Sequence, residues 1–176
     1  MARPVEPATD EAAQFESFYA SHYQDILAYA PRRTETPEDA ADVVAETFLT
    51  AWRRCDQAPD EAAVRLWLYG IARRVTANHI RGRRRYERLG ARLRSRALAT
   101  REPGPQTMGD DRAPIIEALG RLRPADREIL TLVAVEGLAA AEAARVLDCS
   151  VVAARVRLHR ARARFVRELR AAGVTV

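Results

Sequence analysis

Apolar residues recur along this 176-residue chain at spacings of three and four, which is the period of an amphipathic helix. In the first half of the chain the pattern predicts helices over 13–30, 37–54 and 62–81. Thr36 and Pro37 mark the start of the second helix, because threonine is a good N-cap and proline suits the first helical turn. Because every element that the pattern predicts is helical, we expect an all-α fold.

The last third of the chain predicts three more helical segments. The first begins at Pro124, and the second covers 138–147. Asp148 and Cys149 then form a turn, and Ser150 is suited to cap a third helix, because its hydroxyl can accept a backbone N–H bond. Two short helices joined by such a turn are typical of a helix-turn-helix.

These elements divide the chain into two small helical domains. We expect a loose tail over 1–12, a first domain over 13–85 and a second domain over 113–172. Residues 86–112 are rich in arginine and then in proline and glycine, which predicts a flexible linker.

Charge is distributed unevenly between these parts. All 29 basic residues are arginine, against 24 acidic residues, and the net charge is +5. Residues 1–64 are net acidic, whereas the rest of the chain is net basic, which indicates a nucleic-acid partner for the basic part. Arginines surround the third helix of the second domain and could grip phosphates or read guanine edges in a major groove. The plain alternative is a solvated arginine face.

A second candidate for nucleic-acid binding lies in the 62–81 helix and the arginine block that follows it. Trp67 and Tyr69 stand near Arg73 and Arg74, and aromatic rings beside arginines suit unpaired bases and their phosphates. The alternative for both rings is packing in the core of a helical bundle.

Other kinds of chemistry find little support in the sequence. Cys55 and Cys149 are far apart, the three histidines are isolated, and no nucleophile–base pair or phosphate-binding glycine loop is present. We therefore expect no enzymatic activity, cofactor or metal. The chain also begins without an apolar signal-like core and has no apolar run of about 20 residues, so we expect a cytoplasmic protein without membrane insertion.

Two stretches resemble one known family. The segment EGL…EAARVLDCS…VRLHRARARF is similar to region 4 of the extracytoplasmic-function (group IV, sigma-70 type) bacterial sigma factors. The resemblance implies that this helix-turn-helix binds the −35 promoter element and approaches the β flap of core RNA polymerase. The residues it would assign to −35 DNA are Ser150, Arg155, Arg157, Arg160 and Arg162.

The first domain resembles region 2 of the same family. DAADVVAETFLTAWRR is similar to the helix that binds the β′ clamp helices, and LWLYGIARRVTANHIRGRRR to the segment that melts and reads the −10 element. The implied polymerase contacts are Asp39, Asp42, Val43, Glu46, Thr47, Phe48 and Trp52. The implied −10 contacts are Trp67, Tyr69, Arg73, Arg74, Asn78, Arg81 and Arg83.

The chain departs from the family pattern at several positions. Arg74 stands where the family usually has asparagine, and Ala139 and Ala143 stand where it has serine and a branched residue. The expected function is a sigma factor that directs core polymerase to promoters, with an anti-sigma protein as a possible partner. A stand-alone helix-turn-helix regulator, or a sigma-like interaction module without promoter activity, remain the alternatives.

Overall fold

The structure, a computed structural model, describes residues 9–93 and 113–174, which form two compact units divided between Arg94 and Ser95. Every regular element in these ranges is a helix, so the predicted all-α class is confirmed. Residues 9–93 belong to the first unit and residues 113–174 to the second.

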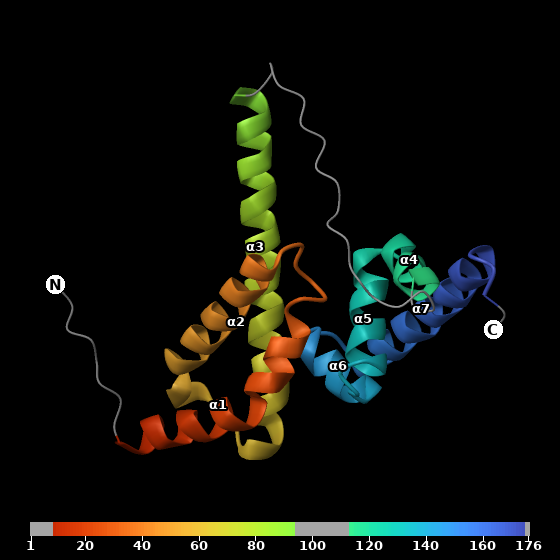
Figure 1. Cartoon of the computed structure of the whole chain (residues 1–176). Helices are drawn as coiled ribbons and strands as arrows, with labels where there is room; N and C mark the ends of the chain where they lie inside the picture. The colour runs from red at the N-terminus through yellow and green to blue at the C-terminus, as the bar shows by residue number, and fades with distance from the viewer. Residues whose placement is uncertain (1–8, 94–112, 175–176) are drawn as a thin grey trace. The chain divides into compact units, whose positions relative to one another are not determined.

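The first unit contains three long helices, α1 (Thr9–Tyr29), α2 (Pro37–Trp52) and α3 (Glu61–Leu93), and the short 3-10 helix η1 (Cys55–Gln57). α2 lies along the first half of α3, and α1 contacts both (Figure 1). The start of α2 is the predicted one. The hydroxyl of Thr36 accepts a hydrogen bond from the backbone N–H of Asp39 at 3.1 Å, and Pro37 occupies the first turn.

The core of this unit is made by the apolar stripes of the three helices. Ile26 and Tyr29 of α1, Val43 of α2 and Leu68 and Ile71 of α3 are all almost fully buried. A smaller cluster of Phe18, Cys55 and Val64 closes the end of the unit near η1, with Phe15, Ala58 and Trp67 packed against it.

Two predicted boundaries in this part of the chain are wrong. α1 begins at Thr9, so residues 9–12 are helical rather than part of a loose tail. α3 runs to Leu93 and projects beyond α1 and α2, so 86–93 are helical where the proline- and glycine-based argument predicted linker (Figure 1). The proline and glycine residues that motivated the linker come later, within 94–112, and that part lies outside the described residues.

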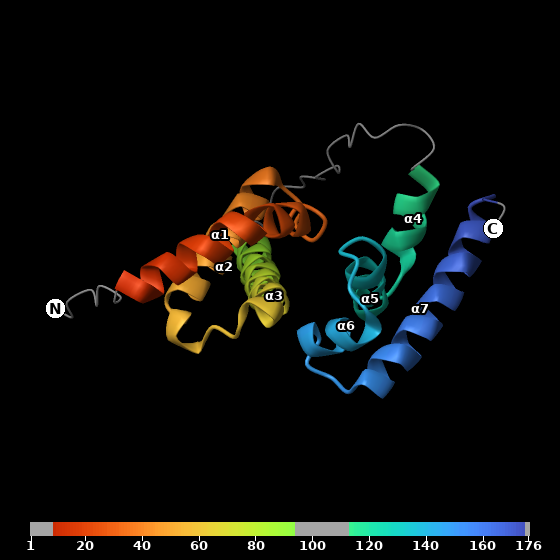
Figure 2. The same cartoon turned by 90° about the horizontal axis from the view of Figure 1, so that it is seen from below.

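The second unit contains four helices, α4 (Ala113–Arg121), α5 (Pro124–Ala134), α6 (Ala140–Val146) and α7 (Val151–Ala171) (Figure 2). α5, α6 and α7 are the three helices predicted from the sequence, and α6 with α7 forms the helix-turn-helix. The Ser150 hydroxyl caps α7 by accepting from Ala153 N–H at 3.1 Å, as predicted. α4 was not predicted, and it packs against α7.

Three local features shape the connections between these helices. Gly137 adopts a φ of 71° between α5 and α6, and Asp148 a φ of 53° between α6 and α7, both in the left-handed region. The Arg127 guanidinium donates to the carbonyl oxygens of Leu119 at 2.9 Å and Gly120 at 2.6 Å. It thereby satisfies carbonyl groups that the end of α4 leaves without helical partners.

Candidate nucleic-acid interface

The predicted polymerase-binding residues of α2 fall on two different faces of that helix. Val43, Thr47 and Phe48 are buried, and the Thr47 hydroxyl donates to the Val43 carbonyl at 2.6 Å. In this structure these three side chains pack the unit, and their assignment as polymerase contacts stays a prediction. Asp42 and Glu46 are exposed.

The exposed face of α2 also contains an apolar residue that the sequence analysis missed. Leu49 is 42% exposed and stands one turn after Glu46. Trp52 is half-buried, with its ring 4.9 Å from that of Phe15 and edge-on to it. The surface that α2 offers to a partner is therefore a mixed one, with carboxylates followed by Leu49 and the rim of Trp52.

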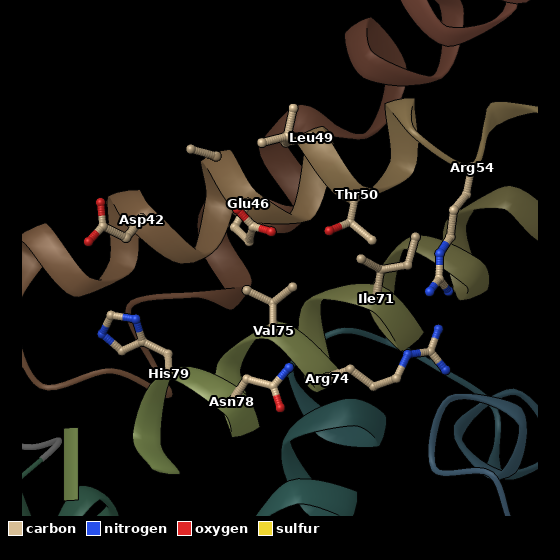
Figure 3. Close-up of a pocket in the computed structure, with 11 residues that line it drawn as sticks. Asp42, Glu46, Leu49, Thr50, Arg54, Ile71, Arg74, Val75, Asn78 and His79 are labelled. Atoms are coloured by element: carbon tan, nitrogen blue, oxygen red, sulfur yellow. The ribbon is translucent and has the colours of Figure 1, made fainter. Parts of the chain in front are cut away.

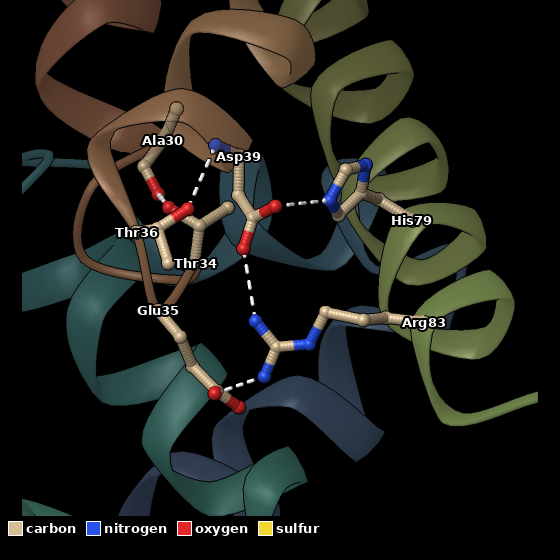
Figure 4. Close-up of polar contacts among 7 residues, drawn as sticks. All are labelled: Ala30, Thr34, Glu35, Thr36, Asp39, His79 and Arg83. Atoms are coloured by element: carbon tan, nitrogen blue, oxygen red, sulfur yellow. Dashed lines mark hydrogen bonds and ion pairs between the residues drawn. The ribbon is translucent and has the colours of Figure 1, made fainter. Parts of the chain in front are cut away.

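Asp39, the remaining member of that predicted set, belongs to a network that joins α2 to α3 (Figure 4). Its two carboxylate oxygens lie 2.9 Å from His79 Nε2 and 2.9 Å from Arg83 Nη1. The hydrogen bond with His79 is the largest cause that lowers the pKa of Asp39 below its ordinary value. Glu35 forms a second ion pair with Arg83, and these carboxylates raise the pKa of the guanidinium.

This network changes the assignment of two predicted contacts. Both carboxylate oxygens of Asp39 bond to side chains of α3, and the Asp39 side chain is only 18% exposed. Asp39 therefore joins α2 to α3 rather than facing a partner. Arg83, predicted to bind −10 DNA, is held by Asp39 and Glu35. Its charge is therefore already compensated in this structure.

The two aromatic residues predicted to contact −10 bases are packed inside the first unit. Tyr69 is 1% exposed, with its ring centroid 5.5 Å from that of Tyr29. Trp67 is half-buried against the Phe18 cluster, its ring 6.4 Å from that of Phe18. Burial excludes Tyr69 from base stacking in this structure, and the core-packing alternative holds for it.

The predicted −10 arginines and asparagine divide by exposure in the same way. Arg73 is half-buried, and its Nε atom is inaccessible to solvent. Arg74, Asn78 and Arg81 are exposed, and Arg81 donates to the Asn78 side-chain oxygen. Because these three residues are spaced four and three apart, they lie along one face of α3.

A groove between α2 and α3 brings exposed members of both predicted sets together (Figure 3). Its volume is about 650 Å³, and Asp42 and Glu46 from α2 line it together with Arg74 and Asn78 from α3. Ile71 and Val75 form its floor, and Arg54, just after α2, stands at one end. The groove therefore has carboxylates along one part and guanidinium groups at the other.

In the second unit, the five predicted −35 residues lie at or near the free surface of α7. Ser150, Arg155, Arg160 and Arg162 are exposed, whereas Arg157 is half-buried. They do not share one face. Arg155 and Arg162 are seven residues apart on one flank of the buried stripe, and Arg157 and Arg160 lie on the other flank.

The outward face of the first two turns of α7 contains residues that the sequence analysis missed. Val152 is 70% exposed and Val156 is 43% exposed, and His159 is also exposed. With Arg155 they form a mixed apolar and cationic tip at the start of a recognition-type helix. Exposed valines suit contact with thymine methyl groups in a major groove. Val152, Val156 and His159 recur at helical spacing on the side opposite Leu158, so the sequence alone could have indicated that they are exposed.

The rest of α7 is anchored by packing and by one ion pair. Leu158, Ala161 and Leu169 are buried, and Phe165 is half-buried. Arg164 donates to Asp126 of α5, whose side chain is only 7% exposed. Arg164 thus serves to hold α7 in place, while Arg160, Arg162 and Arg167 remain exposed.

Over 9–93 and 113–174, no helix is both long and apolar enough to cross a membrane. In the same ranges, no three histidine, cysteine or acidic side chains are grouped as a metal site would require.

Comparison with known proteins connects both units to one family. Sequence profiles of Sigma-70 region 2 and Sigma-70 region 4 match residues 18–86 and 112–165. The RNA polymerase sigma factor CnrH of Cupriavidus metallidurans is 36% identical over 149 residues, which is 79% of this chain and 78% of CnrH. The ECF RNA polymerase sigma factor SigL of Mycobacterium tuberculosis is 30% identical over 99% of both chains.

Solved structures of sigma factors share the fold of this chain. CnrH in complex with the cytosolic domain of CnrY superposes with a TM-score of 0.64 at 29% identity, over 89% of this chain and 88% of that one. The sigma factor RpoE of Bartonella quintana, in complex with the anti-sigma factor NepR, shares the fold with a TM-score of 0.70 at 23% identity, over 89% and 96%. The region 2 and region 4 matches, the identity to CnrH and SigL and the shared fold lead to one conclusion: the chain belongs to the extracytoplasmic-function family of RNA polymerase sigma factors.

Proposed function

We propose that this protein binds core RNA polymerase and selects promoters, with the first unit on the −10 element and the second on the −35 element. Catalysis is supplied by the polymerase. The observation that carries the proposal is the free outward face of α7, where Val152, Arg155, Val156 and His159 stand exposed while the opposite face is buried. A recognition helix built this way fits a major groove.

The polymerase contact is assigned to the exposed face of α2. Asp42, Glu46 and Leu49 supply charge and apolar area there, and Trp52 adds a half-buried rim. Val43, Thr47 and Phe48 support this face from inside. On this assignment, Asp42→Lys with Glu46→Lys weakens binding to core polymerase without unfolding the unit, because both side chains are exposed.

The −10 contact is assigned to the exposed face of α3 that contains Arg74, Asn78 and Arg81. These side chains line or border the α2–α3 groove, and basic side chains along such a track suit a single strand. Arg83 can join them only if Asp39 and Glu35 release it.

An anti-sigma protein is the third partner in the proposal. The relative CnrH is described in complex with the cytosolic domain of CnrY. Leu27 and Tyr19 of α1 are about 40% exposed, which leaves apolar area for such a protein outside the buried core.

The test of this function is retention of promoter DNA with and without core polymerase. A sigma factor of this family is expected to retain specific DNA when core polymerase is present. Tight, specific binding to duplex DNA without core would instead identify a stand-alone regulator. Binding to core without specific DNA retention would identify an interaction module.

A further inference from the structure

Two arginines from separate segments converge at one end of the α2–α3 groove. Arg54 follows the last residues of α2, and Arg74 comes from α3, and both line the groove. Figure 3 shows their guanidinium groups directed toward each other beside Thr50 and Ile71. The Nη2 atom of Arg74 lies close enough to Gly70 that a Cβ there would be 3.9 Å away, so the side chain folds back along its own helix toward Arg54.

Neither of these arginines has its charge compensated within the described residues. Neither side chain forms a hydrogen bond or ion pair in the part of the chain that the structure describes. The acidic side chains of the groove lie elsewhere along it. Asp42 stands at the far end beside His79 (Figure 3), and Glu46 has Arg53 as its ion-pair partner, at 4.0 Å. Two guanidinium groups that face each other without a carboxylate repel, and an anion between them would relieve the repulsion.

We propose that Arg54 and Arg74 together bind one phosphate of the unpaired promoter strand. Arg54 is then a DNA contact, and Arg74 contacts the DNA backbone rather than a base. The inference rests on the proposed function, and deepens it by naming the group that this end of the groove takes. A guanine edge is matched by one guanidinium and would leave the second charge uncompensated. A phosphate offers several acceptor oxygens and accepts charge-assisted bonds from two arginines at once.

The position of Arg74 on α3 indicates how a single strand could reach the phosphate site. Arg74, Asn78, Arg81 and Arg85 are all exposed and follow one another at spacings of four, three and four, along one face of the helix. This track extends over roughly 16 Å. A single strand that follows it reaches the Arg54–Arg74 end, where Arg54 directly precedes η1. Arg54 then fixes one backbone group, and the rest of the track remains available for the neighbouring nucleotides.

The test uses holoenzyme reconstituted with core polymerase and a promoter fragment in which the −10 region is held open by mismatches. Binding is measured for wild type, Arg54→Ala, Arg74→Ala and the double variant over a range of salt concentrations. Each single variant is expected to lose roughly tenfold in affinity. The double variant is expected to lose much less than the product of the two, because both side chains act on the same phosphate. Its salt slope falls by about 0.7, the value for one single-strand phosphate, rather than by twice that.

A second arm identifies the phosphate directly. Neutral methylphosphonate linkages are placed one at a time through each unpaired strand of the open region. The affinity of wild-type holoenzyme is expected to fall when one particular linkage is made neutral. The affinity of the double variant should not change at that linkage. Arg74→Lys keeps the charge and should retain the salt slope. Arg53→Ala is the matched control, since Arg53 is an exposed neighbour that does not line the groove, and it should behave as wild type at every linkage.

The outcomes separate the phosphate site from the wider proposal. Multiplicative losses in the double variant, or a loss that follows base substitution instead of the neutral linkage, would overturn the shared phosphate. Equal melting temperatures of the variants and wild type exclude misfolding as the source of any loss. A wild-type holoenzyme that starts no transcript would overturn the proposed function, and this inference with it.

Discussion

His79 Nε2 lies 2.9 Å from the carboxylate of Asp39, which joins the middle of α3 to the first turn of α2 across 40 residues of sequence. Asp39 also accepts from Arg83, and its backbone N–H is capped by Thr36. The residues that resemble a polymerase-binding motif and those that resemble a −10 motif therefore meet in one polar network. Asp39 stabilises the arrangement of α2 and α3, on which both proposed contacts depend.

Replacement of His79 with alanine is expected to reduce the free energy of unfolding by about 1 kcal/mol at neutral pH. The pKa of Asp39 is lowered chiefly by His79. A carboxyl with a lowered pKa in the folded state contributes stability above its ordinary pKa and loses it as the pH falls through the folded value. The difference between His79→Ala and wild type should therefore shrink in acid, once Asp39 is protonated in both.

Urea unfolding at neutral and at acidic pH measures this difference. His159→Ala is the control, since His159 is exposed on α7 in the other unit, and it should leave stability unchanged at both pH values. A destabilisation by His79→Ala that persists unchanged in acid would show that the imidazole acts by packing and not through Asp39.

The N-terminus of α6 has only half of a capping box. Glu142 accepts from the Ala139 backbone N–H at 2.7 Å, but alanine at the N-cap has no side chain to return the bond. Ala139→Ser is expected to stabilise the second unit by about 1 kcal/mol, because the hydroxyl can accept from the N–H of Glu142. Thermal unfolding measures the gain. Ala141→Ser, at an exposed position within α6, is the control and should not stabilise.

Much of the fold could be predicted because its signals are local. Thr36 with Pro37, and Ser150 after the Asp148 turn, mark helix starts within a few residues, and the structure confirms both. α4 was not predicted, although its apolar residues recur at helical spacing. It is only nine residues long and follows a proline- and glycine-rich stretch, and its Ile115 and Ile116 are partly exposed instead of forming a buried stripe.

The candidate sites could be predicted only as segments, not as contacts. Matching a motif identifies residues of the right type, but it does not separate those that pack from those that face a partner. Tyr69, Val43 and Phe48 match and are buried. Arg83 matches and is held by carboxylates that come from α2 and the loop before it. Those pairings depend on tertiary packing, which periodicity in one helix cannot reveal.

The ion pair between Asp126 and Arg164 should stabilise the packing of α7 against α5. Asp126→Ala is expected to cost about 1–2 kcal/mol, less than for a fully buried pair, because the Arg164 side chain is 33% exposed and can turn to water. A double-mutant cycle with Arg164→Ala measures the coupling. Additive losses would show that the pair contributes nothing of its own.

The turn after α5 requires a backbone conformation that favours glycine. Gly137 has a φ of 71°, and no atom lies within 4 Å of the position that a Cβ would take, so Gly137→Ala is expected to cost about 1 kcal/mol through the backbone alone. Gly120→Ala is the matched control. Gly120 also has open space around it but lies within α4, so alanine there should stabilise by about 0.5–1 kcal/mol. Equal effects of the two substitutions in thermal unfolding would contradict the assignment.

Run-off transcription with purified core polymerase, from a pool of fragments of the host genome, tests the central claim most directly. We expect specific transcripts that require this protein. Arg155→Ala combined with Val156→Ala, on the exposed face of α7, is expected to reduce them sharply while core binding is retained. Arg164→Ala removes the ion pair to Asp126 and leaves the exposed face of α7 intact, so it should leave the choice of promoters unchanged. Transcripts that do not depend on this protein, or a choice of promoters indifferent to the exposed face of α7, would contradict the account.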